Sequence, residues 1–167
     1  MTALIAGCRG TSRAWPDVDQ VAYVVPDLKS AVAEWSRRLG DVQWSSYTYE
    51  AAALPVAGFR GGVAEFEMKV ALSSTVPQVE LIEPLKGPSV YHEFISRRGH
   101  GFHHVGRFVT EVSACVRKLS SQGIEPAQWG GGYGMDGDGG FAYYDAGEYF
   151  VEFIEVPRRR RPSEALV

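Results

Sequence analysis

The sequence has little cysteine, no long apolar run and no excess of positive charge, and each shortage excludes a class of protein. Two cysteines, Cys8 and Cys115, are too few for a disulfide framework, and we expect Cys115 to be a buried thiol on a helix. No apolar run approaches the roughly 20 residues of a membrane-spanning helix, so we expect no membrane partner. The net charge of −3 disfavours a nucleic-acid partner.

The start of the chain contains IAGC at residues 5–8, which looks like the cleavage site of a bacterial lipoprotein. Seven residues precede Cys8, and they hold neither a basic start nor an apolar core of sufficient length. We therefore expect no signal peptide and a cytoplasmic location. The composition, 45% apolar and 22% charged, is typical of a globular protein with a buried core.

A short strand pattern occurs twice, as VELIEP at residues 79–84 and as VEFIEVP at residues 151–157. Alternate side chains of a strand lie on opposite faces, so Glu80 and Glu152 each share a face with an isoleucine. An ionised carboxylate on a largely apolar strand is costly unless something satisfies it. Two such carboxylates at matching positions suggest one shared partner.

The repeat extends over most of the chain. Residues 19–28 align with residues 103–112, and each run is rich in β-branched or aromatic residues and closes on an acidic residue, Asp27 or Glu111. This pattern predicts a strand that leads into a helix, and Asp27 is suited to cap that helix. An apolar stripe and a terminal glycine define each helix. Further strands are expected at 42–49, 65–73 and 77–83, and again at 125–129, 140–145 and 148–155.

The chain is therefore predicted to be an α+β protein of two tandem βαβββ modules. The expected divisions are an N-terminal tail (1–16), a first module (17–84), a linker with a short helix (85–100), a second module (101–156) and a basic C-terminal tail (157–167).

Two segments are expected to stay outside the core. Residues 130–140, GGGYGMDGDGG, read as a mobile loop that packs no core, and they lack the Gly-Lys-Ser/Thr ending of a phosphate-binding loop. The run from Arg158 to Arg161 is expected to be solvated, with contact to an acidic partner as the alternative.

Each module offers one polar residue on its first strand and one glutamate on its last: Gln20 and Glu80, then His104 and Glu152. If the modules pack with pseudo-twofold symmetry, the four side chains point into one cleft. Their oxygen and nitrogen atoms suit a divalent metal, and two carboxylates would offset its charge. The alternative is structural, with His104 as a buried core histidine and the glutamates as edge-strand charges.

The order of these motifs resembles the vicinal oxygen chelate superfamily, which includes glyoxalase I, methylmalonyl-CoA epimerase, extradiol dioxygenases and antibiotic-sequestering proteins. The resemblance rests on DQVAYVVPDL, VELIEP, GHGFHHV and FVEFIE and covers residues 17–156. It implies a curved, half-open barrel, a homodimer, and a metal held by Gln20, Glu80, His104 and Glu152. His103 is expected to point to the opposite face and to be structural.

The sequence lies closest to the epimerase-like branch but departs from it at one position. Methylmalonyl-CoA epimerases usually carry histidine where this chain has Gln20. Glutamine there is similar to some glyoxalase I enzymes, although no glutathione-binding pattern is found. Extradiol dioxygenases need two histidines and one carboxylate for iron(II), so the ring-cleaving reaction is disfavoured.

The expected function is that of an isomerase, epimerase or lyase that depends on zinc, cobalt, nickel, manganese or magnesium. Glu80 and Glu152 would be the catalytic residues that take and return a proton alpha to a carbonyl of a small molecule or acyl thioester. The alternative is a metal-free protein of the same fold that binds or sequesters a small molecule. Under either function, four aromatic residues near the cleft are candidates for an apolar pocket or for the core: Trp44, Tyr47, Phe66 and Tyr143.

Overall fold

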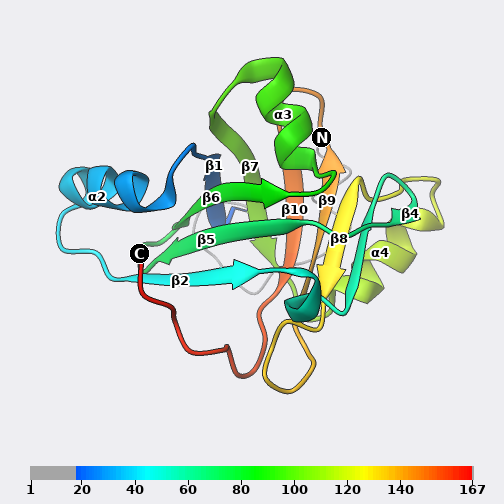
Figure 1. Cartoon of the computed structure of the whole chain (residues 1–167). Coiled ribbons are helices and arrows are strands. Elements are labelled where there is room, and N and C mark those ends of the chain that lie inside the picture. Colours follow the sequence, from blue (N-terminus) through cyan, green and yellow to red (C-terminus); the bar gives the residue numbers. More distant parts are fainter. Residues whose placement is uncertain (1–17, 167) are drawn as a thin grey trace.

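A computed structural model describes residues 18–166, so the expected N-terminal tail and its IAGC stretch lie outside the described residues. The described residues form a single curved sheet with three helices and one short 3-10 helix, Ala51–Ala53 (Figure 1). The helices are α2 (Leu28–Leu39), α3 (Val90–Arg98) and α4 (Val112–Ser120). The strands are β1 (Gln20–Val24), β2 (Trp44–Tyr49), β3 (Val56–Phe59), β4 (Gly62–Val63), β5 (Glu67–Ser73), β6 (Gln78–Lys86), β7 (Gly101–Phe108), β8 (Gln128–Gly131), β9 (Gly140–Asp145) and β10 (Phe150–Glu155).

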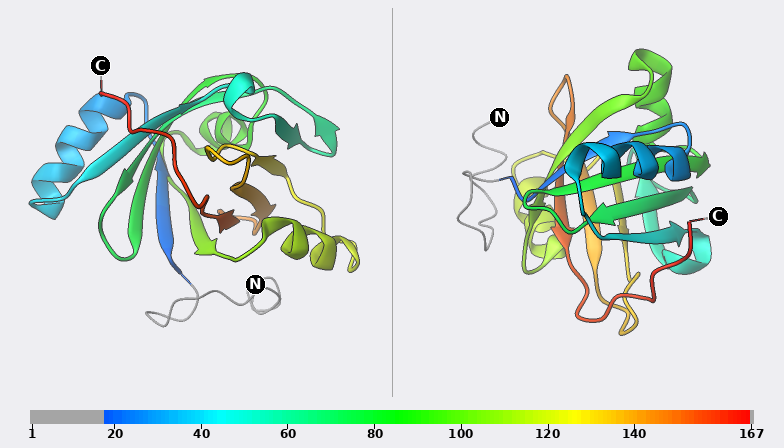
Figure 2. Two further views of the ribbon diagram at one scale, coloured as in Figure 1. Left: turned by 90° about the horizontal axis from the view of Figure 1, so that it is seen from below. Right: turned by 90° about the vertical axis from the view of Figure 1, so that its left-hand side faces the viewer.

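The order of strands in the sheet is β2-β5-β6-β1-β7-β10-β9-β8-β3-β4. The first strands of the two repeats, β1 and β7, are antiparallel neighbours, and each pairs in parallel with the last strand of its own repeat, β6 or β10. The sheet curls around its inner face, as the two further views show (Figure 2). The α+β class and the half-open barrel are thus confirmed.

Alternation along the strands divides the apolar residues between the inside of the barrel and its outside. On β6, Val79 and Leu81 pack under α2, whereas Ile82 belongs to the inner cluster. On β10, Val151 and Phe153 pack under α4. Both glutamates of the repeated pattern therefore lie on the inner face, as the period of two predicts.

Helices α2 and α4 cover the outer face of the sheet, one on each half. The Asp27 carboxylate caps α2 by accepting a hydrogen bond from the backbone N–H of Ser30 at 2.7 Å, and Gly40 ends that helix with φ of 81°. Cys115 on α4 is buried, as expected. None of the helices in the described part of the chain is long and apolar enough to cross a membrane.

A hairpin between β2 and β5 was not predicted. Its strand β3 pairs with β8, so a segment from the first half of the chain extends the sheet of the second half. The hairpin is short, turns at Arg60 and Gly61, and exposes Val63 at 94%. It therefore carries none of the alternation that marks a half-buried strand.

The expectation for the glycine-rich stretch, that it packs no core, was wrong. In the glycine-rich stretch, Tyr133 is buried in the inner cluster and its hydroxyl donates a hydrogen bond to the Glu155 carbonyl. In the basic tail, Arg158, Arg159 and Arg161 are exposed, as expected, and Arg158 and Arg159 also form ion pairs with Asp138 and Asp136. Tertiary contacts between these two segments order both of them.

Candidate metal centre

Backbone pairing brings the predicted positions together on the inner face of the sheet. Glu80 on β6 pairs with Ala22 on β1, and Ala22 pairs with His104 on β7. A small residue therefore lies between the two polar ones. Because its side chain is a single methyl group, Glu80 and His104 can reach toward each other above it.

The second half of the site repeats this arrangement. Glu152 on β10 pairs with Gly106 on β7, and Gly106 pairs with Gln20 on β1. Gly106 fits closely between its neighbours, because a Cβ there would lie 2.8 Å from Gln20 Oε1 and 2.8 Å from Ile154 Cδ1. Sequence analysis assigned no role to Gly106, whose signal is its alignment with Ala22 in the repeat.

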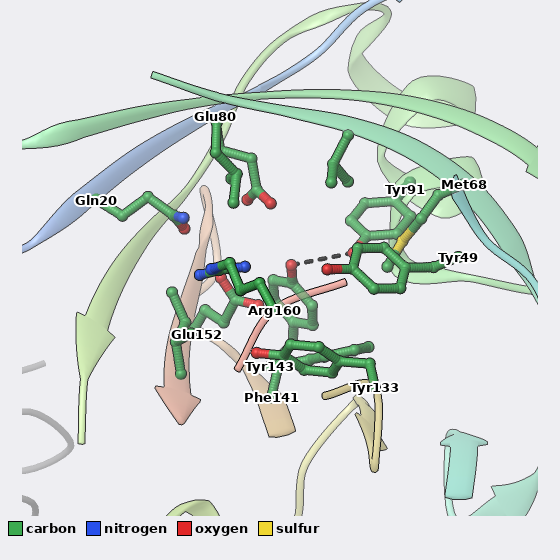
Figure 3. Close-up of a pocket in the computed structure, with 13 residues that line it drawn as sticks. Gln20, Tyr49, Met68, Glu80, Tyr91, Tyr133, Phe141, Tyr143, Glu152 and Arg160 are labelled. Carbon is green, nitrogen blue, oxygen red and sulfur yellow. Dashed lines mark hydrogen bonds between the residues drawn. The ribbon is translucent and has the colours of Figure 1, made fainter. Parts of the chain in front are cut away.

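The four predicted side chains meet around the Nε2 atom of His104. From this nitrogen, Glu152 Oε2 lies at 2.9 Å, Glu80 Oε2 at 3.3 Å and Gln20 Oε1 at 3.3 Å. All four residues are buried, and His104 is fully so. Figure 3 shows Gln20, Glu80 and Glu152 converging on one side of the pocket.

The charges of this cluster act strongly on one another. Burial lowers the pKa of His104, but the charges and hydrogen bonds of Glu152 and Glu80 outweigh this effect and raise it to about 9. Burial is the largest effect on Glu152 and raises the pKa of its carboxyl, while His104 acts in the opposite direction. Two buried carboxylates therefore need a positive charge beside them.

The donor set fits a divalent cation. Glu80, His104 and Glu152 each offer a ligand atom, and these atoms lie within 4.8 Å of one another. The separations of 2.9 and 3.3 Å from His104 Nε2 are close to the spacing between ligands that sit about 2.1 Å from one ion, roughly 3.0–3.4 Å. In the present orientation, the Gln20 amide also turns its oxygen toward these atoms.

The His103 side chain contacts the His104 ring. The prediction that His103 points to the opposite face of the sheet was therefore wrong. The β1–β7 register shifts where Ala22 pairs with His104 and Tyr23 with Phe102, so His103 is the extra residue of a β-bulge. As a result, the Nδ1 atoms of the two histidines lie 2.9 Å apart.

This contact orients the His104 ring. Burial lowers the pKa of His103 well below its usual range, and the neighbouring His104 lowers it further, so His103 is neutral. A neutral His103 can accept the Nδ1 proton of His104 at this distance. The Nε2 atom of His104 then faces the two glutamates, where a bound metal would take the place of its proton.

Two tyrosines buried in the barrel support Glu152. Tyr143 on β9 pairs with Glu152 across the sheet and supplies a side-chain hydrogen bond to its carboxylate. Tyr91 at the start of α3 donates a hydrogen bond to the Tyr143 hydroxyl at 3.0 Å (Figure 3). Sequence analysis named Tyr143 and missed Tyr91, because no local pattern places the start of α3 inside the barrel.

The pocket in front of the cluster is small, with a cavity volume of about 40 Å³, and it is partly open to solvent. Of the four aromatic candidates, Tyr143 lines this pocket, whereas Trp44 packs under α2 and donates its indole N–H to Ser36 Oγ. Phe66 and Tyr47 belong to the inner core. Besides Tyr143 and the candidate ligands, the pocket is lined by aromatic and aliphatic side chains and one arginine: Tyr49, Met68, Val70, Leu72, Tyr91, Tyr133, Phe141, Ile154 and Arg160.

Comparison with known proteins agrees with this architecture. A sequence profile of the Glyoxalase/Bleomycin resistance protein/Dioxygenase superfamily matches residues 19–144, a span that includes Gln20, Glu80 and His104. The chain is also 27% identical over 108 residues to the uncharacterized protein YqjC of Bacillus subtilis (strain 168), covering 65% of this chain and 68% of that protein.

Solved structures show the same fold. Methylmalonyl-CoA epimerase from Mycobacterium tuberculosis superposes with a TM-score of 0.57 and 22% identity, over 88% of this chain and 93% of that one. A hypothetical protein from Bacillus halodurans C-125 gives 0.54 and 20%, over 86% and 96%. A methylmalonyl-CoA epimerase solved with methylmalonyl-CoA and NH4+ gives 0.53 and 14%, over 87% and 98%. Profile, fold and paired strands together establish that this chain belongs to the glyoxalase/bleomycin resistance protein/dioxygenase superfamily, the vicinal oxygen chelate proteins.

Proposed function

We propose that this protein is a divalent-metal-dependent isomerase or epimerase that moves a proton on a carbon next to a carbonyl group. The observation that supports the proposal is the convergence of Gln20, Glu80 and Glu152 on His104 Nε2 in a buried pocket. These four residues would hold the metal. A metal bound there would supply Lewis acidity that stabilises negative charge on substrate oxygens.

The two glutamates are the candidates for proton transfer, because they come from opposite halves of the barrel and both line the pocket. One carboxylate would take the proton as the C–H bond breaks, and the electron pair of that bond would move toward the carbonyl. The other would return a proton to the same carbon for epimerisation, or to the next carbon for isomerisation. Burial raises the pKa of Glu152, which makes its carboxylate a stronger base than an ordinary glutamate.

The first experiment measures metal content by mass spectrometry on protein purified without an affinity tag. We expect about one divalent metal ion per chain in the wild type and its loss in Glu152→Ala. The matched control is Glu148→Ala, which removes an exposed carboxylate that pairs with Arg98 at the surface. Loss of metal in the control, or equal metal content in Glu152→Ala and the wild type, would contradict the proposed ligand set.

The second experiment follows proton exchange by NMR in D2O, with 2-oxo acids, hydroxy ketones and methylmalonyl-CoA as test compounds. We expect deuterium to enter alpha to the carbonyl with the wild type and not with Glu80→Gln or Glu152→Gln. Circular dichroism checks that both variants fold. Exchange at the wild-type rate in both variants would refute the catalytic role of the glutamates.

Metal-free binding of a small molecule is the second candidate, and one observation favours it. If the Gln20 amide rotates by half a turn, its nitrogen donates toward Glu152 Oε2 at 3.2 Å and Glu80 Oε2 at 3.3 Å. A protonated His104 would then complete a cluster that needs no metal. Wild-type protein that takes up no metal from added divalent ions would favour this function.

Dimerisation, implied by the family, is a separate prediction that light scattering tests.

A further inference from the structure

The chain does not end at the barrel but returns across its open side. After β10, residues 156–166 run to the free side of β2, where Ser46 and Glu164 form an antiparallel bridge (Figure 1, red segment). The Glu164 carboxylate accepts hydrogen bonds from the Thr48 backbone at 3.0 Å and from the Thr48 hydroxyl at 2.6 Å. The segment is therefore attached at its far end.

Its near end is attached as well. Arg158 pairs with Asp138, with 3.0 Å between Nε and Oδ2, and Arg159 pairs with Asp136. Exposed ion pairs of this kind stabilise a fold little, but two of them in succession define the path of the chain. Arg160 follows the near attachment directly, so the path of the chain fixes the position of its backbone.

Arg160 lies in the wall of the pocket that contains the candidate metal centre (Figure 3). It is half-buried, and its guanidinium carbon lies 5.8 Å from the centre of the Tyr47 ring, a cation–π contact that holds it in place. Unlike Arg158 and Arg159, it forms no ion pair with any carboxylate of residues 18–166. Its hydrogen-bond donors are therefore available to a ligand.

The charges around the pocket favour an anion at this guanidinium. The charged side chains of the wall are Glu80, Glu152 and Arg160. The two carboxylates would offset a divalent cation, so the charge of Arg160 would stay unmatched until a substrate supplies a negative group. Tyr49 and Tyr133 complete this side of the pocket, and burial raises the pKa of both, which leaves them as neutral hydroxyl groups.

We propose that Arg160 binds a carboxylate of the substrate, which makes the substrate a small carboxylic acid with a carbonyl group near the acid. A guanidinium and a carboxylate match in a planar, two-pronged geometry, which would fix the substrate relative to Glu80 and Glu152. The placement of the reacting carbon and the charge balance of the pocket rest on the proposed function, whereas the position of Arg160 in the pocket wall does not. Neutral hydroxy ketones and catechols are excluded as good substrates.

The test compares malonate with malonamide, its neutral analogue, by isothermal titration calorimetry. The proteins are the wild type, Arg160→Gln, Arg160→Lys and the control Arg97→Gln, which removes the same charge from the exposed surface of α3. We expect wild type and control to bind malonate equally, Arg160→Gln to bind it roughly 10- to 100-fold more weakly, and Arg160→Lys to lie between them. Malonamide should bind weakly to all four.

Metal content measured on the same samples separates the two proposals. Loss of malonate affinity in Arg160→Gln with metal retained supports both. Wild-type protein without metal that still needs Arg160 for malonate refutes the metal centre and supports the role of Arg160. Equal malonate affinity in wild type and Arg160→Gln, tight binding of malonamide, or no malonate binding by the wild type would each overturn the inference.

Discussion

Replacement of Gly106 by alanine is the sharpest test of how the two halves of the site fit together. On β7 alone, this change should help, because alanine loses less conformational freedom than glycine on folding. The structure reverses that expectation. The new Cβ would lie 2.8 Å from Gln20 Oε1, 2.8 Å from Ile154 Cδ1 and 2.9 Å from Gln20 Cβ.

The size of the effect follows from these contacts. Carbon atoms in contact normally lie about 3.5–4.0 Å apart, so Gln20 or Ile154 must move by roughly 0.7 Å. Overpacking of this kind costs about 1–3 kcal/mol, and the reduced entropy of the unfolded chain returns about 0.4–1 kcal/mol. We expect a net loss of roughly 1–2 kcal/mol in the free energy of unfolding, which lowers Tm by about 2–8 °C.

The same displacement should weaken metal binding. Gln20 and Glu152 flank Gly106 on the two neighbouring strands, so a shift of Gln20 separates one predicted ligand from the other three. We expect at least a roughly tenfold loss of metal affinity, which is the smallest effect typical of a change next to a metal site.

The assay combines thermal unfolding of the metal-free protein with competition against a chelator for metal affinity. Gly62→Ala is the matched control, because its Cβ would meet only the Phe59 carbonyl at 3.9 Å. The control should keep both Tm and metal affinity. A Gly106→Ala protein with a higher Tm and unchanged metal affinity would refute the argument that this glycine makes room for the site.

Four further variants test other parts of the structure. His103→Phe should lower metal affinity roughly 10- to 100-fold with the fold intact, because His104 loses the acceptor that orients its ring; equal affinity in chelator competition would remove His103 from the site. Tyr143→Phe should slow deuterium exchange at unchanged metal content, because Glu152 loses a hydrogen bond, and an unchanged rate would mean that this bond is structural. In Ser89→Ala, helix α3 loses its N-cap, the Ser89 hydroxyl that accepts a hydrogen bond from the His92 backbone N–H. This variant should lose about 1 kcal/mol in the free energy of unfolding, measured in urea, without a change in metal content. Glu164→Ala should weaken malonate binding more than it changes Tm, because Glu164 attaches the segment that carries Arg160; the opposite pattern would show that the segment only stabilises β2.

Much of the fold could be predicted because its pattern is local and occurs twice. The period of two in VELIEP and FVEFIE assigns Glu80 and Glu152 to the inner face whatever else the chain does. The acidic residue at the end of β1 predicts the start of α2, and Asp27 caps that helix. The β3–β4 hairpin escaped prediction because its pairing with β8 joins residues far apart in the sequence.

The candidate site likewise has features that the sequence predicts and features that depend on the tertiary structure. The sequence by itself determined which four side chains point toward one another and which face of the sheet they occupy, because side-chain direction follows from local backbone geometry. Only the tertiary structure decided that a bulge turns His103 toward His104, that Tyr91 reaches Tyr143, and that the chain returns to place Arg160 in the pocket. These contacts depend on register and on the closure of long loops, whose free energies come from packing between distant segments and leave no periodic trace in the sequence.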